Sequence, residues 1–454
     1  MIGAIADDFT GATDVAVAFR RAGMRVSIVF GPPVGLDSID EVAPDPALDP
    51  APDPAPDVIV VALKSRTIAT ADAVAQSLAA ARWLQSQGCD RFYFKYCSTF
   101  DSSPAGNIGP VADALADHLG AGIVVATPAS PVHGRTVYQG TLFVGEQLLS
   151  ESPMRRHPLT PMTDSNLVRV LSAQTPRQVG LVPHAVIAAG SAAIADSLER
   201  MHRAGTRYAV ADAIDDADLA ELGRAVSSHV LVTGAAGLAA GVAAALAAER
   251  DAGAAAAAPI RSAADGPTTA DRYRTPAVLA GSCSARTLEQ VALFRRSNPS
   301  FRLDAVATPD AAALADAALA WFDSLERGPA PLIYSSVEPQ ALRAAQEALG
   351  AALLADVIET AMARIATGLV ERGVERLVVA GGETSGSVTS ALGVRAGVVG
   401  DEEAPGVPWI FAEQPRRLAL LLKSGNFGDP ELLLRASARH GGHGGQGSGD
   451  DREG

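Results

Sequence analysis

The chain has 454 residues, of which 48% are hydrophobic and 19% are charged, and its net charge is −14. This length exceeds one ordinary hydrophobic core and predicts two or three domains. The negative charge, without a visible cluster of Lys and Arg, argues against nucleic acid as a partner. The opening residues, MIGAIADD, lack the apolar segment of a signal peptide, and no apolar stretch is long enough to span a bilayer. We therefore expect a cytoplasmic protein with no membrane partner.

The cysteines give no sign of a metal site. Cys89, Cys97 and Cys283 lack ligand spacing and form an odd number, which fits a reducing compartment. We interpret them as packing residues.

Short β-branched runs alternate with helical patterns along the first half of the chain. The predicted strands, in order, are residues 2–6, 26–30, 58–63, 92–96, 123–126, 179–182, 208–211 and 230–233. Helical patterns follow several of them, for example at residues 12–22 and 71–87. Such alternation predicts a mostly parallel sheet with covering helices, in an N-terminal domain of residues 1–250.

Three segments interrupt these patterns. Residues 42–57, VAPDPALDPAPDPAPD, cannot supply ladder donors and are interpreted as a loop insertion. Residues 251–276 mix an Ala run with Asp, Gly, Pro and Thr and are interpreted as a linker between domains. Residues 440–454 are Gly-rich and polar and are predicted to be a disordered tail.

A second α/β pattern fills residues 277–439. Its predicted strands are residues 277–280, 332–335, 377–380 and 418–422, and its predicted helices include one that starts at Ala285 and one at residues 356–372. Two such domains joined by one linker predict an active site in the cleft between them.

The first polar motif is ADDFTGATD, residues 6–14. The first predicted strand delivers Asp7 and Asp8 at its carboxyl end, where ligands bind in α/β folds. Such carboxylates can orient a substrate hydroxyl, accept its proton or hold a cation. The alternative is that Asp8 or Thr10 only caps the following helix.

A second polar motif, FKYCSTFDSSPAGNIGP, follows a strand at residues 94–110. A lysine at a strand end can pair with a carboxylate, and the hydroxyl groups that follow can bond a hydroxylated anion. The candidate ligands here are Lys95, Ser98, Thr99, Asp101 and Asn107. The alternative is a surface lysine followed by ordinary turn residues.

Arg135 and Thr136 lie in the loop after the strand at residues 123–126. Arginine is a bidentate partner for a carboxylate, which makes Arg135 a further candidate. An exposed loop arginine is more commonly just solvated.

Two turns of the second half repeat one design: a strand ends in glycine, small hydroxyl residues follow, and a helix begins. They are LAGSCS at residues 279–284 and VAGGETSGS at residues 379–387, and KSGN follows the strand at residues 418–422. Glycine lets phosphate approach the backbone, and a helix start offers free N–H groups. The predicted nucleotide ligands are Ser282, Ser284, Gly381, Gly382, Glu383, Thr384, Ser385 and Gly425. Generic glycine turns of a sheet are the alternative.

Two common nucleotide signatures are missing. No G-x-x-x-x-G-K-[ST] occurs, so this is not a P-loop enzyme. No G-x-G-x-x-G follows a strand with an acidic residue about twenty positions on, which argues against a dehydrogenase.

The motifs together resemble the four-carbon acid sugar kinases, most closely the 3-oxo-tetronate kinases. Three further segments carry the resemblance: GRTVYQG from Gly134, ESPMRRHPLTPMTDSNLVRVL from Glu151 and LKSGNFG from Leu422. All of these motifs occur in the family's order. The resemblance implies an N-terminal domain that binds the acid sugar and a C-terminal domain that binds ATP. The implied reaction is ATP-dependent phosphorylation of the terminal hydroxyl, with Asp8 as hydroxyl ligand or base. Lys95 and Arg135 would then hold the carboxylate.

The resemblance leaves several points open. The family's usual pattern has His where Thr141 stands, and a Phe-Pro pair in place of Ser130 and Pro131. Kinases of D-threonate or D-erythronate share the domain plan, and a non-catalytic protein that binds a small acid is a rival of another class. Magnesium is expected as cofactor; its ligands are unidentified, with Glu383 and Asp401 the nearest acidic candidates. The sequence also leaves the stereoisomer and the oligomeric state, including a homo-oligomer, open.

Overall fold

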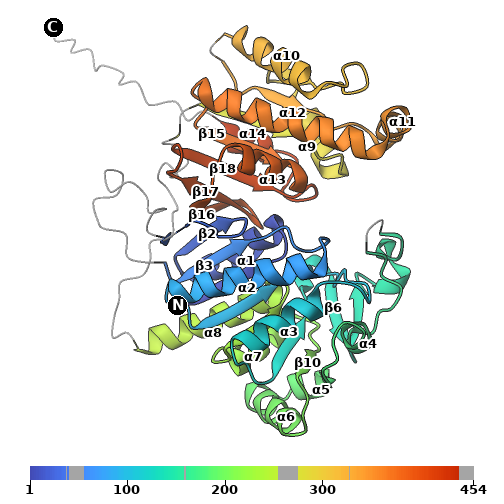
Figure 1. The fold of residues 1–454 in the computed structure, drawn as a ribbon, viewed down its shortest axis with the longest axis vertical. Helices are drawn as coiled ribbons and strands as arrows, with labels where there is room; N and C mark the ends of the chain where they lie inside the picture. The colour runs from blue at the N-terminus through green and yellow to red at the C-terminus, as the bar shows by residue number, and fades with distance from the viewer. Residues whose placement is uncertain are drawn as a thin grey trace, which may run out of the picture.

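The computed structural model describes residues 1–36, 38–39, 56–157, 160–253, 273, 275–326 and 328–438. The strands of this part of the chain form one 15-stranded sheet and a separate sheet of three strands, with helices over them (Figure 1). The predicted mostly parallel α/β fold is confirmed. Most of the predicted loop and linker, and the whole tail, lie outside the described residues. None of the described helices is long and apolar enough to cross a membrane.

The N-terminal half contributes parallel strands in the order β2-β3-β1-β4-β11-β5-β10-β9. They are β1 (Ile2–Ala6), β2 (Val26–Phe30), β3 (Val58–Ala62), β4 (Arg91–Lys95), β5 (Val124–Thr127), β9 (Val179–Val182), β10 (Tyr208–Ala211) and β11 (Leu231–Gly234). Several of these strands are buried along their whole length, as strands of a parallel sheet covered on both faces must be.

Helices cover both faces of this half. They are α1 (Phe9–Arg21), α2 (Thr70–Ser86), α3 (Ile108–His118), α4 (Leu167–Ser172), α5 (His184–Ile187), α6 (Ser191–Arg203), α7 (Asp216–Val226) and α8 (Ala236–Gly253). Helix α8 packs against α1 and α7, whereas α2 packs against α3. The small sheet, β6 (Arg135–Tyr138), β7 (Thr141–Val144) and β8 (Gln147–Leu148), follows β5 and was not predicted.

The C-terminal half contributes parallel strands in the order β13-β14-β12-β15-β18. They are β12 (Pro276–Ala280), β13 (Ser300–Arg302), β14 (Leu332–Tyr334), β15 (Arg376–Ala380) and β18 (Leu418–Lys423). The helices are α9 (Ala285–Phe294), α10 (Ala311–Asp323), α11 (Pro339–Leu349), α12 (Ala351–Glu371), α13 (Gly382–Ala391) and α14 (Leu432–Ser437). Helix α12 packs against α10 and α13, and α9 packs against α14.

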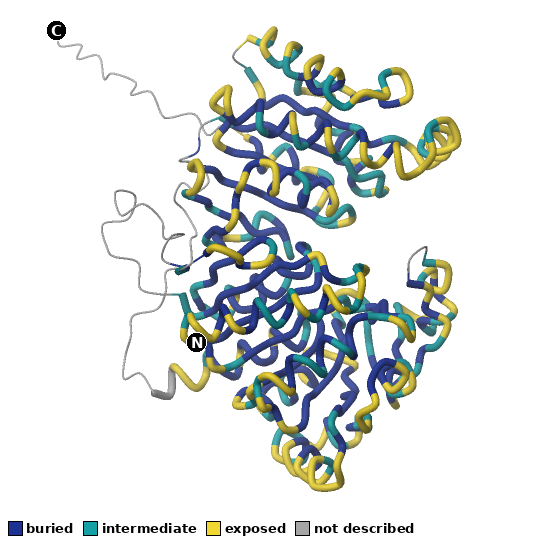
Figure 2. Tube along the Cα trace, viewed as in Figure 1, coloured by how far each residue is buried: buried dark blue, intermediate teal, exposed yellow. Residues whose placement is uncertain are grey.

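One antiparallel hairpin joins the two halves into a single sheet. Strand β16 (Ala396–Ala404) pairs with β2 on one side and with β17 (Val407–Ala412) on the other, and β17 pairs with β18. The sequence predicted two separate sheets and missed this hairpin. Figure 2 shows the strands of both halves as a buried interior beneath exposed helix faces.

The hairpin reverses the strand direction, so the parallel strands of the two halves run in opposite senses along the sheet. Neighbouring strands are also rotated by about 20–25°, so the six steps from β15 to β1 turn the strand direction by roughly 120–150°. Reversal and twist nearly cancel. The carboxyl ends of β1 and β15 can therefore face the same region.

Candidate functional site

A cavity of about 110 Å³ lies at the carboxyl ends of β1, β4, β5 and β11. We call it the N-terminal cavity. Its lining residues are Asp8, Thr10, Gly11, Asp14, Arg66, Lys95, Cys97, Ser98, Ser130, His133, Ala235 and Ala236. Three of the predicted substrate residues, Asp8, Lys95 and Ser98, are thus brought together.

Arg66, from the loop after β3, holds the two predicted aspartates. Its Nε and Nη2 donate to the Asp7 carboxylate at 2.9 and 2.8 Å, and Nη2 also lies 2.8 Å from Asp8 Oδ1. Asp8 Oδ1 accepts a further hydrogen bond from the Gly11 N–H at 2.9 Å, so Asp8 does cap α1. The capping role is compatible with a ligand role, because Asp8 still borders the N-terminal cavity.

Asp7 does not line the N-terminal cavity. It is buried and borders a neighbouring cavity of only about 10 Å³, together with Asp101 and Asn107. Burial raises the pKa of the Asp7 carboxyl, and the charge of Arg66 opposes this rise. The bidentate pair with Arg66 makes Asp7 suited to positioning that guanidinium.

Lys95 ends β4 and points its ammonium group at the start of α1. The side chain is 3% exposed, and Nζ donates to the Tyr96 carbonyl at 2.8 Å. A Cβ added to Gly11 would come within 2.8 Å of Lys95 Nζ. This contact explains why glycine stands in the middle of the ADDFTGATD motif.

Asp101 bonds to both Thr99 and Cys97. The Thr99 hydroxyl donates to Asp101 Oδ1, and the Cys97 thiol donates to the same oxygen at 2.7 Å. Burial raises the pKa of the Cys97 thiol to about 12, so it stays protonated. These contacts shape the loop that presents Ser98.

Asn107 bonds to backbone and side-chain groups of one loop. Its Nδ2 donates to the carbonyls of Ser65 at 2.8 Å and Ile68 at 2.9 Å, and its Oδ1 accepts from Thr70 Oγ1 at 2.9 Å. The predicted ligand Asn107 therefore fixes the loop that carries Arg66.

Arg135 and Thr136 start the small sheet beside the N-terminal cavity, without lining it. Arg135 Nη1 donates to the His133 carbonyl, whereas its Nε is buried and has no hydrogen-bond partner among the described residues. His133 Nδ1 bonds to Ser130 Oγ at 2.8 Å. An unpaired guanidinium donor at this place suits an incoming carboxylate.

Asp14 is a cavity residue that the sequence analysis missed. It lies on the second turn of α1, three residues after Gly11 and four after Thr10, so the three share one helix face. Burial raises the pKa of Asp14 to about 6, while Lys95 and Arg66 act to lower it. Asp14 is the last aspartate of ADDFTGATD. Its helical spacing from the glycine was the sequence signal that could have placed it in the site.

The predicted nucleotide residues come together at the carboxyl ends of the neighbouring strands β12, β15 and β18. A Cβ at Gly281 would clash with the Thr384 hydroxyl, and a Cβ at Gly425 would lie 2.5 Å from Ser282 Oγ. The glycines thus let three turns pack closely. Gly382 differs, because the nearest atom to its Cβ would be Thr10 Oγ1 at 3.7 Å.

A buried lysine braces the third of these turns. Lys423 is 1% exposed, and its Nζ donates to Gln290 Oε1 at 2.7 Å and to the Gly425 carbonyl at 3.0 Å. Desolvation lowers the pKa of Lys423 to about 8. With its donors occupied by protein oxygens, Lys423 supports the loop that contains Gly425.

A largely apolar cavity of about 560 Å³ adjoins the first turn. Cys283, between the two predicted serines, borders it, as do residues after β13 and β14. Helix α9 follows β12 and packs against α14, whereas α11 and α12 follow β14, and α12 packs against α10. The cavity thus lies at the switch point of the sheet, where ligands of open α/β folds bind.

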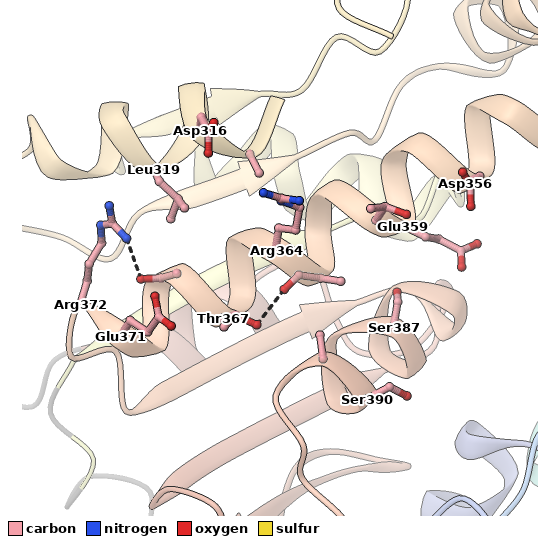
Figure 3. Close-up of a pocket in the computed structure, with 15 residues that line it drawn as sticks. Asp316, Leu319, Asp356, Glu359, Arg364, Thr367, Glu371, Arg372, Ser387 and Ser390 are labelled. Carbon is pink, nitrogen blue, oxygen red and sulfur yellow. Dashed lines mark hydrogen bonds between the residues drawn. The ribbon is translucent and has the colours of Figure 1, made fainter. Parts of the chain in front are cut away.

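A larger cavity, of about 750 Å³, lies between α10, α12 and α13 (Figure 3). Of the side chains drawn there, Thr367 donates to the Ala363 carbonyl and Arg372 donates to the Gly368 carbonyl, and Arg372 also pairs with Asp323 of α10. None of the predicted site residues lines it. We therefore assign it no part in the site.

The N-terminal cavity lies at one edge of the sheet, the N-terminal edge, and the three glycine-containing turns lie at the other, the nucleotide edge. These two edges meet at α1. Beyond the approach of Gly382 to Thr10, the ring of Phe427 lies 5.9 Å from that of His133. Arg21 of α1 pairs with Glu402 of β16 at 2.7 Å, and Arg20 with Asp401 at 3.6 Å. The N-terminal cavity and the nucleotide turns are therefore adjacent.

Within the described residues, no group of three or more His, Cys, Asp or Glu side chains is arranged to hold a metal ion. Of the two acidic candidates, Asp401 pairs with Arg20 and Glu383 is exposed in the first turn of α13.

Comparison with protein families matches both halves of the chain. Residues 2–242 match the family described as "Sugar-binding N-terminal domain", and residues 277–433 match "Nucleotide-binding C-terminal domain".

Similar proteins cover nearly the whole chain. The 3-oxo-tetronate kinase of Burkholderia multivorans is 47% identical over 96% of both chains, and that of Cupriavidus necator is 46% identical over 98% of both. Among solved structures, a Salmonella typhimurium protein described as a putative tRNA synthase is 41% identical, with a TM-score of 0.83. It is matched over 96% of this chain and 98% of its own.

Proposed function

This chain belongs to the four-carbon acid sugar kinase family, and on that premise we propose that it transfers the γ-phosphoryl group of ATP to the terminal hydroxyl of 3-oxo-tetronate. The product is 3-oxo-tetronate 4-phosphate. The observation that supports this most is the meeting of the two edges at α1, with Thr10 facing Gly382. Phosphoryl transfer asks mainly for alignment of two substrates and for neutralised charge.

For ATP, we propose that the phosphates bind to the three turns. Ser282, Ser284, Gly381, Gly382, Glu383, Thr384, Ser385 and Gly425 are the proposed contacts. Ser385 Oγ is buried with no partner among the described residues, which supports a ligand at this helix start. The 560 Å³ cavity beside Cys283 has room for the adenosine.

We propose that magnesium binds largely to phosphate oxygens and water, because the described residues offer no group of three or more His, Cys, Asp or Glu side chains to hold it. When bound, it neutralises charge on the phosphates.

For the acid sugar, we propose that Lys95 and Arg135 bind the carboxylate. Asp8 contacts the hydroxyl that is phosphorylated, as its ligand or as the base. Ser98, with Thr99, Asp101 and Thr136 around it, completes the substrate side, and Asp7 and Asn107 support it through Arg66. The cavity of about 110 Å³ suits a four-carbon molecule.

Sister activities remain the rivals. D-threonate and D-erythronate present the same carboxylate and terminal hydroxyl, and Thr141 replaces the family's usual His. A tRNA synthase activity is not favoured, because the net charge of −14 is poorly suited to nucleic acid.

The test measures ADP release with a coupled assay, in the presence of ATP, magnesium and a panel of four-carbon acids. We expect turnover with 3-oxo-tetronate above that with D-threonate or D-erythronate. Turnover with D-threonate or D-erythronate alone would make that acid the substrate in place of 3-oxo-tetronate. Binding of an acid without ADP release would favour a non-catalytic acid-binding protein.

A further inference from the structure

Two carboxylates line the N-terminal cavity, and they differ in how they are occupied. Asp8 accepts from the Gly11 N–H and pairs with Arg66. Asp14 receives no hydrogen bond and forms no ion pair within the part of the chain that the structure describes. Its lone pairs are therefore available to a ligand.

Asp14 also lies where the nucleotide half reaches the N-terminal cavity. A Cβ on Gly406, in the turn between β16 and β17, would be 3.5 Å from Asp14 Oδ1 and 3.3 Å from the Phe427 ring. Phe427 follows Gly425 in the third nucleotide turn. Thr10, one helical turn before Asp14, faces Gly382. A hydroxyl placed between the cavity and the nucleotide turns would therefore be next to Asp14.

Four charged groups act on Asp14 from the elements packed around it. Lys95 of β4 and Arg66 after β3 favour its charged form, whereas Asp8 and Glu402 of β16 disfavour it. Burial outweighs the two cations, so the pKa of Asp14 is raised to about 6. A base with a pKa near the working pH accepts a proton efficiently and is still mostly ionised at pH 7.

We propose that Asp14 is the general base of the phosphoryl transfer and that Asp8 orients the substrate hydroxyl without taking its proton. This inference rests on the kinase reaction proposed above. The hydroxyl oxygen forms a bond to the γ-phosphorus as the bond from that phosphorus to the β,γ-bridging oxygen breaks. The hydroxyl proton moves to the Asp14 carboxylate, ADP leaves, and Asp14 later releases the proton to water.

The test compares Asp14→Asn with Asp8→Asn, each nearly isosteric, using magnesium-saturated ATP from pH 5 to pH 9. Wild-type enzyme is measured first, and its failure to turn over any four-carbon acid would refute the proposed function itself. For Asp14→Asn we expect kcat to fall by about 10²–10⁴-fold, with KM and ATP affinity nearly unchanged. Below about pH 6 the wild-type rate should fall as Asp14 protonates, and Asp14→Asn should lose this dependence. Asp8→Asn should keep it.

Three results would overturn the proposal. The first is a kcat within about threefold of wild type in Asp14→Asn, or a loss that falls on KM. The second is an acid limb that Asp14→Asn retains, which would belong to another group. The third is rescue of Asp14→Asn by excess magnesium, which would make Asp14 a metal ligand. Calorimetry of ATP binding and circular dichroism show in each case that the variant is folded.

Discussion

The two edges that meet at α1 are built from different kinds of groups. The N-terminal cavity is built from charged side chains, several of which already pair with one another, as Arg66 does with Asp7 and Asp8. The nucleotide edge is built from glycines, hydroxyl groups and helix starts, with its buried Lys423 occupied by protein oxygens. The N-terminal edge therefore depends on a network of charges, whereas the nucleotide edge depends on room beside the backbone.

The largest effect should come from breaking the charge network. Arg66→Met removes the partner of buried Asp7, and a buried carboxylate without its partner typically costs about 3–5 kcal/mol of stability. We expect a clear loss of unfolding free energy in urea and loss of activity. The double variant Arg66→Met with Asp7→Asn should recover part of the stability, because the more deeply buried carboxylate is then neutral and only the more exposed Asp8 has lost its arginine. Equal stability of the single and double variants would contradict this account.

The nucleotide edge should instead be sensitive to a small side chain added at a glycine. The Cβ that Gly382→Val adds meets no protein atom closer than 3.7 Å. It should still hinder a phosphate and weaken one or two hydrogen bonds of about 1.5–3 kcal/mol each, or roughly 10- to 100-fold in ATP affinity or more. Calorimetry measures this, and acid-sugar binding should survive. Gly328→Val, also at a glycine with room around it, is the control. Unchanged ATP affinity in Gly382→Val would contradict phosphate binding at this turn.

A third prediction concerns Asp14 and pH. Because the pKa of Asp14 is raised, the folded state binds more protons than the unfolded state between about pH 4 and pH 6. The charged carboxylate therefore lowers the stability of the folded state, and this loss reaches its full size above about pH 6. Allowing for its partial exposure, Asp14→Asn should be more stable at pH 8 by on the order of 2 kcal/mol, and the gain should shrink toward pH 4. Asp164→Asn is the control of opposite sign, because Arg169 lowers the pKa of Asp164. Melting temperatures across this pH range test both.

The smallest effect is expected at Arg135, which lies beside the N-terminal cavity. Arg135→Ala removes a half-buried guanidinium with an unpaired Nε, so KM for the acid should rise about tenfold, for about 1.5 kcal/mol, with kcat changed less. Arg155→Ala, an exposed arginine of the same half, should leave KM unchanged. A fall confined to kcat in Arg135→Ala would argue against carboxylate binding there.

The same contrast explains what the sequence could predict. The nucleotide turns are local, since a strand, a glycine and a helix start follow one another in LAGSCS and AGGETSG. Arg66 belongs to the N-terminal cavity only because its loop folds back onto β1, and its motif, LKSRT, carries no obvious signal. Asp14 was within reach, at helical spacing from Thr10 and Gly11.

The hairpin that joins the sheets could not be recognised from alternation. Asp401, Glu402 and Glu403 follow one another in β16, and Pro408 lies in β17. The Pro405–Gly406 pair was its one turn signal. How the two edges meet depends on the number of twisted strands between them, which no local pattern contains.

The most direct measurement is the identity of the product. With ATP, magnesium and 3-oxo-tetronate, phosphorus NMR should show ADP and one new phosphomonoester whose phosphorus couples to the protons of the terminal carbon. Loss of this signal in Gly382→Val at limiting ATP would link it to the nucleotide edge. Formation of no phosphomonoester from any four-carbon acid, by a folded protein that binds ATP, would contradict the account.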